Sequence, residues 1–594
     1  MTACRVRIGP SPSKLGRGGS TLNTVSWRGA RFVALAIWLH GCGGGGGNAA
    51  PNPPAPVPAT VVLQGAVTFD LVPAVAGRGL DYTQTVEHPA RGVTVEVVSA
   101  GTVLASTATD HVGHYSFTVA SNTDVSLRVR AEMVRLGSPS WDFRVVDNVN
   151  SNALYALAGA VFTTGTADST RDLHAASGWT GSGYTATRSA APFAILDVVY
   201  DSVQVVLGTV PTIAFPPLQM RWSTGNMPVS GAGPGDIGSS RFIPGVGIEL
   251  VGAAEQDTDE YDRHVIAHEW GHYLEDAFSR SDNIGGAHSI TDQVDMRVAF
   301  SEGWASAFSA IATHDSVYVD TFGAGQAHNF SFDLEQSPNR HNPNPGWFNE
   351  EAVQSLLYDL YDNGRDVAPG TLTLDDLALG FGPLFDVMMN QQRHTVALPS
   401  IFSLLDALKR ARVADAPLID QLTTAQGMRP VVDEYGATET NYGVPTKRTP
   451  QEVAADFHSV YDTVMVNGPA VNVCSLDDYT SAATGAGNKL ASRRFVRFAV
   501  TTPGPHVVTA RAVAPLLGAA DPDLKLHAPD GSVLPSTGPP QCTVVTPEAC
   551  VESFTPTLAA GEYVLEVYEW SNTNDTTDQF PPIGRTCFDV TVTR

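Results

Sequence analysis

The chain has 594 residues, which is too long for one hydrophobic core, so several folded units are expected. Its formal net charge of −25 argues against binding to nucleic acid or to an anionic membrane through a basic surface, because either polyanion would repel it. Charged residues make up only 16% of the chain, whereas 55 glycines and 40 prolines interrupt it, as is typical of exported proteins rich in strands and loops.

The N-terminal segment has the features of an export signal. Two arginines precede the apolar run 32–39, which is too short to cross about 30 Å of hydrocarbon as a helix. We therefore predict that residues 1–41 are a signal peptide. The residues from Leu39 to Cys42 resemble a bacterial lipobox, which implies lipid attachment at Cys42 and a membrane anchor in the bacterial cell envelope, at the outer membrane or the cell surface. The alternative is that Cys42 follows an ordinary signal peptide by chance, in which case the protein would be secreted without a lipid.

The next segments change from a tether to strands. Residues 42–60 hold a tract of glycine followed by proline with no apolar period, which predicts a flexible tether. Across residues 61–146, short runs alternate apolar and polar side chains between turn residues, and this period of two predicts a β-sandwich. The string "PARGVTVEVVSAGTVLASTATDHVGHYSF" resembles the prealbumin-like, carboxypeptidase-regulatory repeats of secreted bacterial proteins, which implies a structural role.

The middle and the end of the chain differ in their periodicity. In residues 151–467, apolar side chains recur at helical spacing after Ala191, although residues 245–252 are typical of a strand. In residues 468–594 the alternation of strands returns, and this module resembles a pre-peptidase C-terminal β-sandwich. The expected fold is multidomain, with a mainly helical α+β middle between an N-terminal and a C-terminal β-sandwich.

Four of the six cysteines lie in the last module, at positions 474, 542, 550 and 587. Such clustering in a strand-rich module predicts two disulfides formed in an oxidising compartment, with three possible connectivities. We favour the pairs Cys542 with Cys550 and Cys474 with Cys587.

The stretch "DRHVIAHEWGHYLED" places His268, Glu269 and His272 in the order H-E-x-x-H. Residues four apart share a face of a helix, so the two histidines can bind one ion with the glutamate beside them. Two histidines and a carboxylate inside a protein are costly unless they are paired or bind a metal. A metzincin is excluded, because Glu275 and Phe278 stand where that class needs Gly and His.

A catalytic zinc needs a third protein ligand and one position open to water. The best candidate is Glu302 in "RVAFSEGWASAFSA", where Gly303 and Ala305 allow a close approach of two helices. Because its neighbours are apolar, burying Glu302 without a partner would cost free energy, which favours a metal ligand. The alternative is an ordinary glutamate on the surface of a helix.

The succession of "HEWGH" and "SEGWAS" resembles the gluzincin metallopeptidases of the thermolysin and fungalysin kind, and "NEEAVQSLLYDLYD" is similar to the helix that follows in fungalysin-like enzymes. The resemblance implies a zincin-type catalytic domain that hydrolyses peptide bonds in peptide or protein substrates, as an endopeptidase. It implies Zn²⁺ held by His268, His272 and Glu302. Glu269 is then the general base.

The same resemblance implies a tyrosine or histidine that stabilises the oxyanion. Tyr361 is our candidate and Tyr358 its rival, while core packing is the alternative for each. Three histidines, His288, His341 and His394, are also available, and the sequence does not select among them.

Two further expectations concern the residues around the candidate ligands. Ser301 and Ser306 stand where thermolysin-like enzymes have Asn and Asp partners for the ligand histidines, so Asp295 or Asp276 could substitute for them. The strand at 245–252 could be the edge to which the substrate backbone adds.

The stretch "SRSDNIGGAHSITDQVD" holds Asp282, Asp292 and Asp295 around a Gly-Gly turn, so it is a candidate Ca²⁺ loop. Its spacing does not match an EF-hand, and a solvated acidic loop is the alternative.

A function of another class also fits the sequence. A non-catalytic surface lipoprotein would bind a partner through its β-sandwich modules and keep a structural or inactive metal site. Glu269 favours the enzyme, because a structural metal site needs no base.

Overall fold

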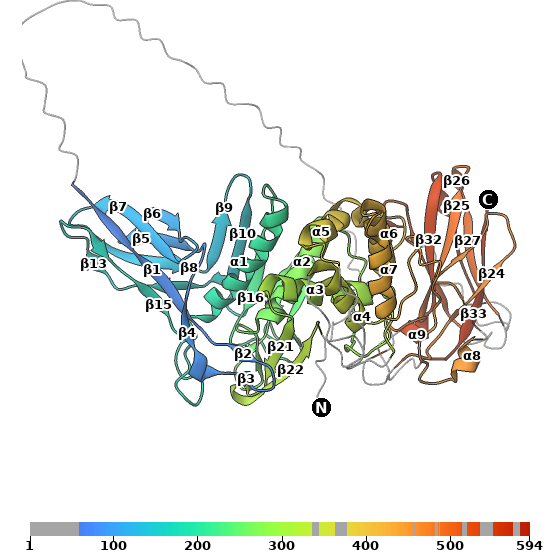
Figure 1. Ribbon diagram of the computed structural model, residues 1–594, viewed down its shortest axis with the longest axis horizontal. Helices are drawn as coiled ribbons and strands as arrows, with labels where there is room; N and C mark the ends of the chain where they lie inside the picture. The colour runs from blue at the N-terminus through green and yellow to red at the C-terminus, as the bar shows by residue number, and fades with distance from the viewer. Residues whose placement is uncertain are drawn as a thin grey trace, which may run out of the picture.

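The computed structural model describes residues 59–335, 344–362, 377–454, 456, 458–480, 485, 487–513, 520–534, 550–573 and 582–594. The chain is multidomain and rich in β-sheet. Strands at the N-terminal end, a central group of helices and a C-terminal β-sandwich follow one another along the long axis (Figure 1). The expected signal peptide and Cys42 lie outside the described residues.

Two sheets form the N-terminal part. The first is built on β1 and contains β1 (Thr60–Leu71), β4 (Val86–Pro89), β7 (His114–Ala120), β14 (Ser169–Thr170) and β15 (Leu173–Ala175). The second contains β5 (Thr94–Ser99), β6 (Thr102–Ala108), β8 (Asp124–Arg130), β12 (Ala156–Ala158) and β13 (Phe162–Thr163). Side chains of β7 alternate between buried and exposed, as the period of two predicts. The strands after residue 150 pair with β1 and β8, so strand pairing crosses the expected boundary at 146–151, and the domain ranges stay a proposal.

A mixed sheet supports the central helices. Its order is β11-β10-β16-β18-β17, with β9 beside β10; the strands are β9 (Glu132–Arg135), β10 (Trp141–Asp147), β11 (Ala153–Leu154), β16 (Leu218–Trp222), β17 (Arg241–Ile243) and β18 (Gly247–Leu250). The expectation that the strand at 245–252 offers a free edge is wrong, because β17 pairs with β18 and takes the edge itself.

A smaller sheet lies in the order β19-β20-β21-β22. Its strands are β19 (Gly252–Ala253), β20 (Asp257–Thr258), β21 (Val317–Phe322) and β22 (His328–Asp333), and a separate hairpin pairs β2 (Ala74–Val75) with β3 (Gly79–Leu80). In the chain, β20 precedes the helix that carries His268 and His272, and β21 follows the helix that carries Glu302.

The longer helices are α1 (Ala191–Thr209), α2 (Arg263–Phe278), α3 (Met296–Thr313), α4 (Glu350–Tyr361), α5 (Phe381–Asn390), α6 (Ile401–Ala411) and α7 (Ala416–Ala425), and two short ones are α8 (Pro450–Ala454) and α9 (Trp570–Thr573). Helix accounts for 24% of the residues that the structure describes, so a mainly helical zincin-type middle stays a proposal. α1 is long and apolar enough to cross a membrane, yet most of it is buried in the protein, as in a core helix.

Small side chains bring α2, α3 and α4 into close contact. A Cβ atom at Gly271 of α2 would lie 3.0 Å from the Cα of Ala305 in α3, and one at Gly303 would lie 2.6 Å from Val353 in α4. Substitution at either glycine would therefore push the helices apart. The predicted close approach of the second motif helix to the first is confirmed.

The C-terminal β-sandwich has two main sheets and its own buried core. One contains β23 (Tyr461–Thr463), β25 (Arg493–Val500), β28 (Pro522–His527), β29 (Val533–Leu534) and β32 (Gly561–Glu569). The other contains β24 (Val471–Ser475), β27 (Val507–Ala512), β30 (Val551–Phe554) and β33 (Thr586–Thr593), and β26 (Gly504–Pro505) pairs with β31 (Thr557–Leu558).

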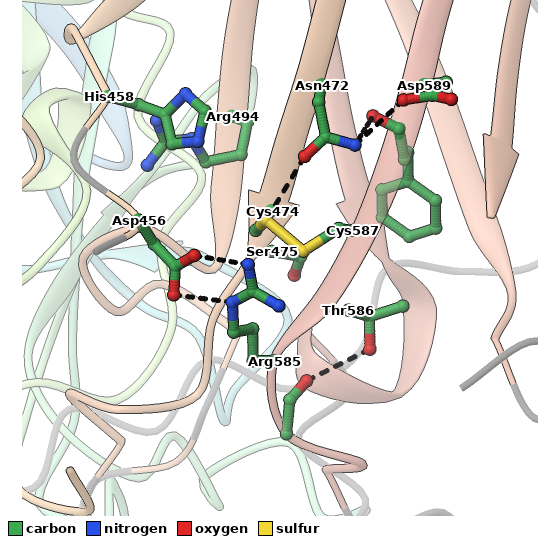
Figure 2. The surroundings of a disulfide bond; sticks show 12 residues. Asp456, His458, Asn472, Cys474, Ser475, Arg494, Arg585, Thr586, Cys587 and Asp589 are labelled. Carbon is green, nitrogen blue, oxygen red and sulfur yellow. Dashed lines mark hydrogen bonds and ion pairs between the residues drawn. A yellow bond between two sulfur atoms is a disulfide. The ribbon is translucent and has the colours of Figure 1, made fainter. Parts of the chain in front are cut away.

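A disulfide joins Cys474 of β24 to Cys587 of β33, where the two residues face each other in the antiparallel ladder (Figure 2). This pair was predicted from the sequence and is confirmed. Cys550 forms no disulfide with any described residue, and Cys542, its predicted partner, lies outside the described residues.

Candidate metal centre

The helical spacing of α2 brings its two histidines together. His268 Nε2 and His272 Nε2 lie 3.1 Å apart, and their side chains are largely buried. Because residues four apart stack along one side of a helix, the pair needs no distant contact to converge.

α3 brings a carboxylate to the same point. Glu302 Oε2 lies 3.3 Å from the Nε2 atom of His268 and 3.3 Å from that of His272, while Asn283 donates a 3.1 Å hydrogen bond to Glu302 Oε1. Bonds of about 2 Å to a tetrahedral zinc ion would separate ligand atoms by about 3.3 Å. Two imidazole nitrogens and one carboxylate oxygen at these separations fit a zinc ion.

Two serines of α3 orient the histidines. His268 Nδ1 lies 3.1 Å from Ser306 Oγ, and His272 Nδ1 lies 3.2 Å from Ser301 Oγ, whose hydroxyl donates to Glu275 Oε2 at 2.6 Å. Ring N–H groups bound at Nδ1 leave both Nε2 atoms free for a metal. Ser301 and Ser306 are therefore the hydrogen-bond partners that orient the two histidines.

Neither aspartate that was expected to replace them reaches the histidines. Asp295 accepts a hydrogen bond from the backbone N–H of Arg297 at the start of α3 and pairs with the Arg297 guanidinium at 2.8 Å. Asp276 is exposed on α2. The expectation that Asp295 or Asp276 orients the ligand histidines is therefore wrong.

The electrostatics of the cluster favour a positive charge at its centre. Burial raises the pKa of Glu302, but the charges of His272 and His288 outweigh it and hold this pKa well below its usual range. Burial likewise lowers the pKa of His272, and the attraction of Glu302 outweighs it and raises this pKa to about 9. A proton or a metal ion can supply that charge.

Glu269 is buried beside the ligands. Its Oε2 atom accepts a 2.6 Å hydrogen bond from the backbone N–H of Phe242 in the edge strand β17. Burial raises the pKa of this carboxyl, which moves it toward the range of a general base. Two cavities, of about 160 and 200 Å³, are both lined by Glu269, His268 and Glu302. A larger hollow of about 700 Å³ is lined in part by Phe242 and by none of the three candidate ligands.

His288 is the histidine that the structure brings to the site. Its Nε2 atom lies 3.6 Å from Glu302 Oε2 and 3.4 Å from Glu350 Oε2, and its Nδ1 atom lies 3.0 Å from the carbonyl oxygen of Gly286. The sequence named His288 without selecting it. The signal in the sequence is its place, because His288 lies in the segment that joins the two helices carrying the candidate ligands.

The other histidine and tyrosine candidates lie elsewhere. Tyr361 is the last residue of α4, eleven residues or about 16 Å along the helix from Glu350 at the cavity, and it lines neither cavity. Tyr358 packs in the core, His394 is exposed, and His341 lies outside the described residues. The tyrosine that lines the cavity is Tyr318 of β21, and its ring lies 6.4 Å from that of His268.

The expected calcium loop has its charges neutralised by basic side chains. Asp282 binds Arg280 at 3.1 Å, Asp292 lies 3.1 Å from Lys489, and Asp295 pairs with Arg297. The three aspartates form no common cluster among the described residues. A calcium ion at this loop has no support from the arrangement.

Comparisons with known proteins match parts of the chain. Residues 240–385 match the family described as Mycolysin C-terminal domain, a range that contains α2, α3 and α4. No curated protein matches the chain. A solved structure, the pre-peptidase C-terminal domain of collagenase from Bacillus anthracis, is 11% identical over 22% of this chain and 93% of that chain, with a TM-score of 0.14, which is too low for an inference about fold or function. One quarter of the chain, including every candidate ligand, is thus similar to a mycolysin domain.

Proposed function

We propose that this protein is a zinc-dependent peptidase of the gluzincin type. The observation that supports it best is the mutual spacing of 3.1–3.3 Å between His268 Nε2, His272 Nε2 and Glu302 Oε2, beside a buried Glu269. The three residues would hold the zinc ion. A zinc ion held there would lower the pKa of a bound water to about 7 and would polarise the scissile carbonyl.

In the proposed reaction, Glu269 accepts the proton of the attacking water and delivers it to the leaving amine. The hydrogen bond from Phe242 fixes one oxygen of this carboxylate and leaves the proton transfer to the other. His288 and Tyr318 line the cavity as candidates for stabilising the oxyanion, in place of Tyr361.

The two cavities support cleavage within a chain. Glu269 and His268 line both, and we propose that a bound peptide extends from the reacting bond into each of them. This arrangement is what an endopeptidase needs. The similarity of residues 240–385 to a domain of mycolysin-type metallopeptidases supports the same reaction class.

The alternative function, a surface lipoprotein with a structural metal site, is less well supported. A structural zinc has four protein ligands. Among the described residues, His268, His272 and Glu302 offer one group of three ligand atoms, and all three line the cavity of about 200 Å³. A buried carboxylate such as Glu269 on the wall of that cavity would have no use in a structural site.

We further propose export and attachment of lipid at Cys42. The disulfide between Cys474 and Cys587 fits an oxidising compartment. Fatty-acid labelling of the wild type, and its loss in Cys42→Ala, is the expected result. Secretion without a lipid follows if the wild type takes up no label.

Two variants test the catalytic proposal. Glu269→Gln keeps the shape and the three ligands but removes the proton acceptor, so hydrolysis of a mixed peptide library should fall at least about 100-fold with zinc near one per chain. Glu302→Ala removes a ligand and should lose both zinc and hydrolysis. Zinc analysis and peptide cleavage measure both. Unchanged hydrolysis in Glu269→Gln contradicts the mechanism, and full zinc affinity in Glu302→Ala moves the third ligand elsewhere.

A further inference from the structure

The loop between α2 and α3, residues 279–295, is held from outside by the C-terminal module. Asn488 and Lys489 lie in the connection from β24 to β25, and they are 2% and 1% exposed. The Asn488 side chain donates a 2.9 Å hydrogen bond to the carbonyl oxygen of Gly285, and Lys489 Nζ donates one of 2.8 Å to that of Ala287. Two alternate carbonyl oxygens of the loop are thus bound by one segment of another module.

The ammonium group of Lys489 has its partners in this contact. A lysine has three N–H donors, and three oxygens surround this one: the carbonyl oxygen of Ala287, Asn488 Oδ1 at 2.9 Å and Asp292 Oδ2 at 3.1 Å. An antiparallel bridge between Val294 and Lys489 continues the contact along the backbone. Because a buried charge is costly unless it is paired and hydrogen-bonded, this lysine favours the loop in its present place.

The stretch held in this way leads into His288. The Nδ1 atom of His288 lies 3.0 Å from the carbonyl oxygen of Gly286, and its Nε2 atom faces Glu302 and Glu350 at 3.6 and 3.4 Å. Gly285 and Gly286 have φ angles of 61° and 100°, and glycines give a backbone little stiffness of their own. Hydrogen bonds from outside the loop therefore fix the backbone that carries the His288 ring.

The central part of the chain holds a different stretch of the loop. Asn349, the residue before α4, donates hydrogen bonds of 3.1 and 3.2 Å to the carbonyl oxygens of Ile290 and Asp292. These carbonyl groups follow His288 in the chain. The stretch that leads directly into His288, residues 285–287, is the one that the C-terminal module binds.

We propose that Asn488 and Lys489 are positioning residues for the metal centre and that the C-terminal module is thereby a required part of the peptidase, an inference that rests on the proposed function. His288 lines the cavity as a candidate for stabilising the oxyanion. A group that acts on the transition state loses much of its effect when it moves by about 1 Å. The candidate zinc ligands lie on α2 and α3 themselves, so loss of these contacts should lower turnover without releasing zinc.

Kinetics of the zinc-loaded full chain test this proposal. In Lys489→Met, kcat for a peptide that the wild type cleaves should fall about 10–100-fold, with KM and zinc content near those of the wild type. Asn488→Ala should show a smaller fall of the same kind, and it replaces Lys489→Met if that variant folds poorly. Arg494→Met is the matched control, because Arg494 is a buried cation of the same module that pairs with Asp462, outside the loop, and its kcat should match the wild type.

A double variant separates positioning from general damage. If Lys489 acts through His288, the combination of His288→Ala with Lys489→Met should be no slower than His288→Ala alone. Hydrogen exchange of residues 283–288 should be faster in Lys489→Met and unchanged in Arg494→Met. Wild-type kcat in Lys489→Met, additive losses in the double variant, or unchanged exchange in the loop would overturn the proposal. If the wild type cleaves no peptide, the proposed function fails, and the exchange measurement still decides whether the C-terminal module holds the loop.

Discussion

Arg297 of α3 and Glu566 of β32 form a buried ion pair between segments 269 residues apart. Arg297 Nη1 lies 2.9 Å from Glu566 Oε2, and the two side chains are 1% and 0% exposed. Arg493 and His527 approach the same carboxylate from within the C-terminal β-sandwich, at 2.5 and 3.1 Å. The helix that carries Glu302 is therefore tied directly to the C-terminal module.

Replacing Arg297 by Met should weaken this attachment. Breaking a buried ion pair costs about 3–5 kcal/mol, and Arg493 remains on Glu566, so we expect a loss of about 3 kcal/mol. Calorimetry should show the central part and the C-terminal module unfolding in two separate steps. Arg493→Met is the control, because it removes a charge from the same carboxylate within one module and should leave the unfolding coupled. Coupled unfolding in both variants would contradict this role of Arg297.

The same pair predicts a dependence on pH. Burial raises the pKa of Glu566, but Arg297 and Arg493 outweigh it and hold this pKa well below its usual range. The stability from this group is thus present above the unfolded pKa of about 4.3 and is lost as the pH falls through the folded pKa. The difference in Tm between wild type and Arg297→Met should narrow below about pH 4. A difference in Tm that stays constant from pH 7 to pH 3 would contradict the predicted role of Glu566.

The serines that orient the ligand histidines should affect metal affinity. Ser306→Ala removes the partner of His268 Nδ1, and zinc affinity should fall about 10–100-fold. Ser301→Ala should weaken zinc binding at least as much, because Glu275 also loses the hydrogen bond from the Ser301 hydroxyl. Competition with a chelator measures both. Ser309→Ala is the matched control, since its hydroxyl donates to the carbonyl oxygen of Ser306 and, among the described residues, contacts no candidate ligand by a hydrogen bond; its zinc affinity should match the wild type.

The disulfide should stabilise the C-terminal module. It closes a loop with a sequence separation of 113, so its removal in Cys474→Ala with Cys587→Ala should cost about 2–5 kcal/mol. A urea titration of the double variant tests this, and mass spectrometry of a non-reduced digest should recover the linked peptides. The ion pair of Asp456 with Arg585 lies near this disulfide (Figure 2). Four free thiols in exported protein would refute both predicted disulfides.

The sequence by itself determined the features that depend on short spacing. His268 and His272 converge because one helical turn separates them, and Glu302 could be predicted because a charged residue among apolar neighbours needs a partner. The clustering of four cysteines predicted disulfides in the last module but left three connectivities open, and the strand pattern of the β-modules follows from a period of two.

Only the tertiary structure decided which side chains from separate segments of the chain lie close to one another. The loop between the ligand helices brings His288 to Glu302, while α4 turns Glu350 to the cavity and Tyr361 away from it. Asp259 meets Asp320, 61 residues later, through the pairing of β20 with β21. No local period encodes these distances, because they depend on how helices and strands pack across the chain.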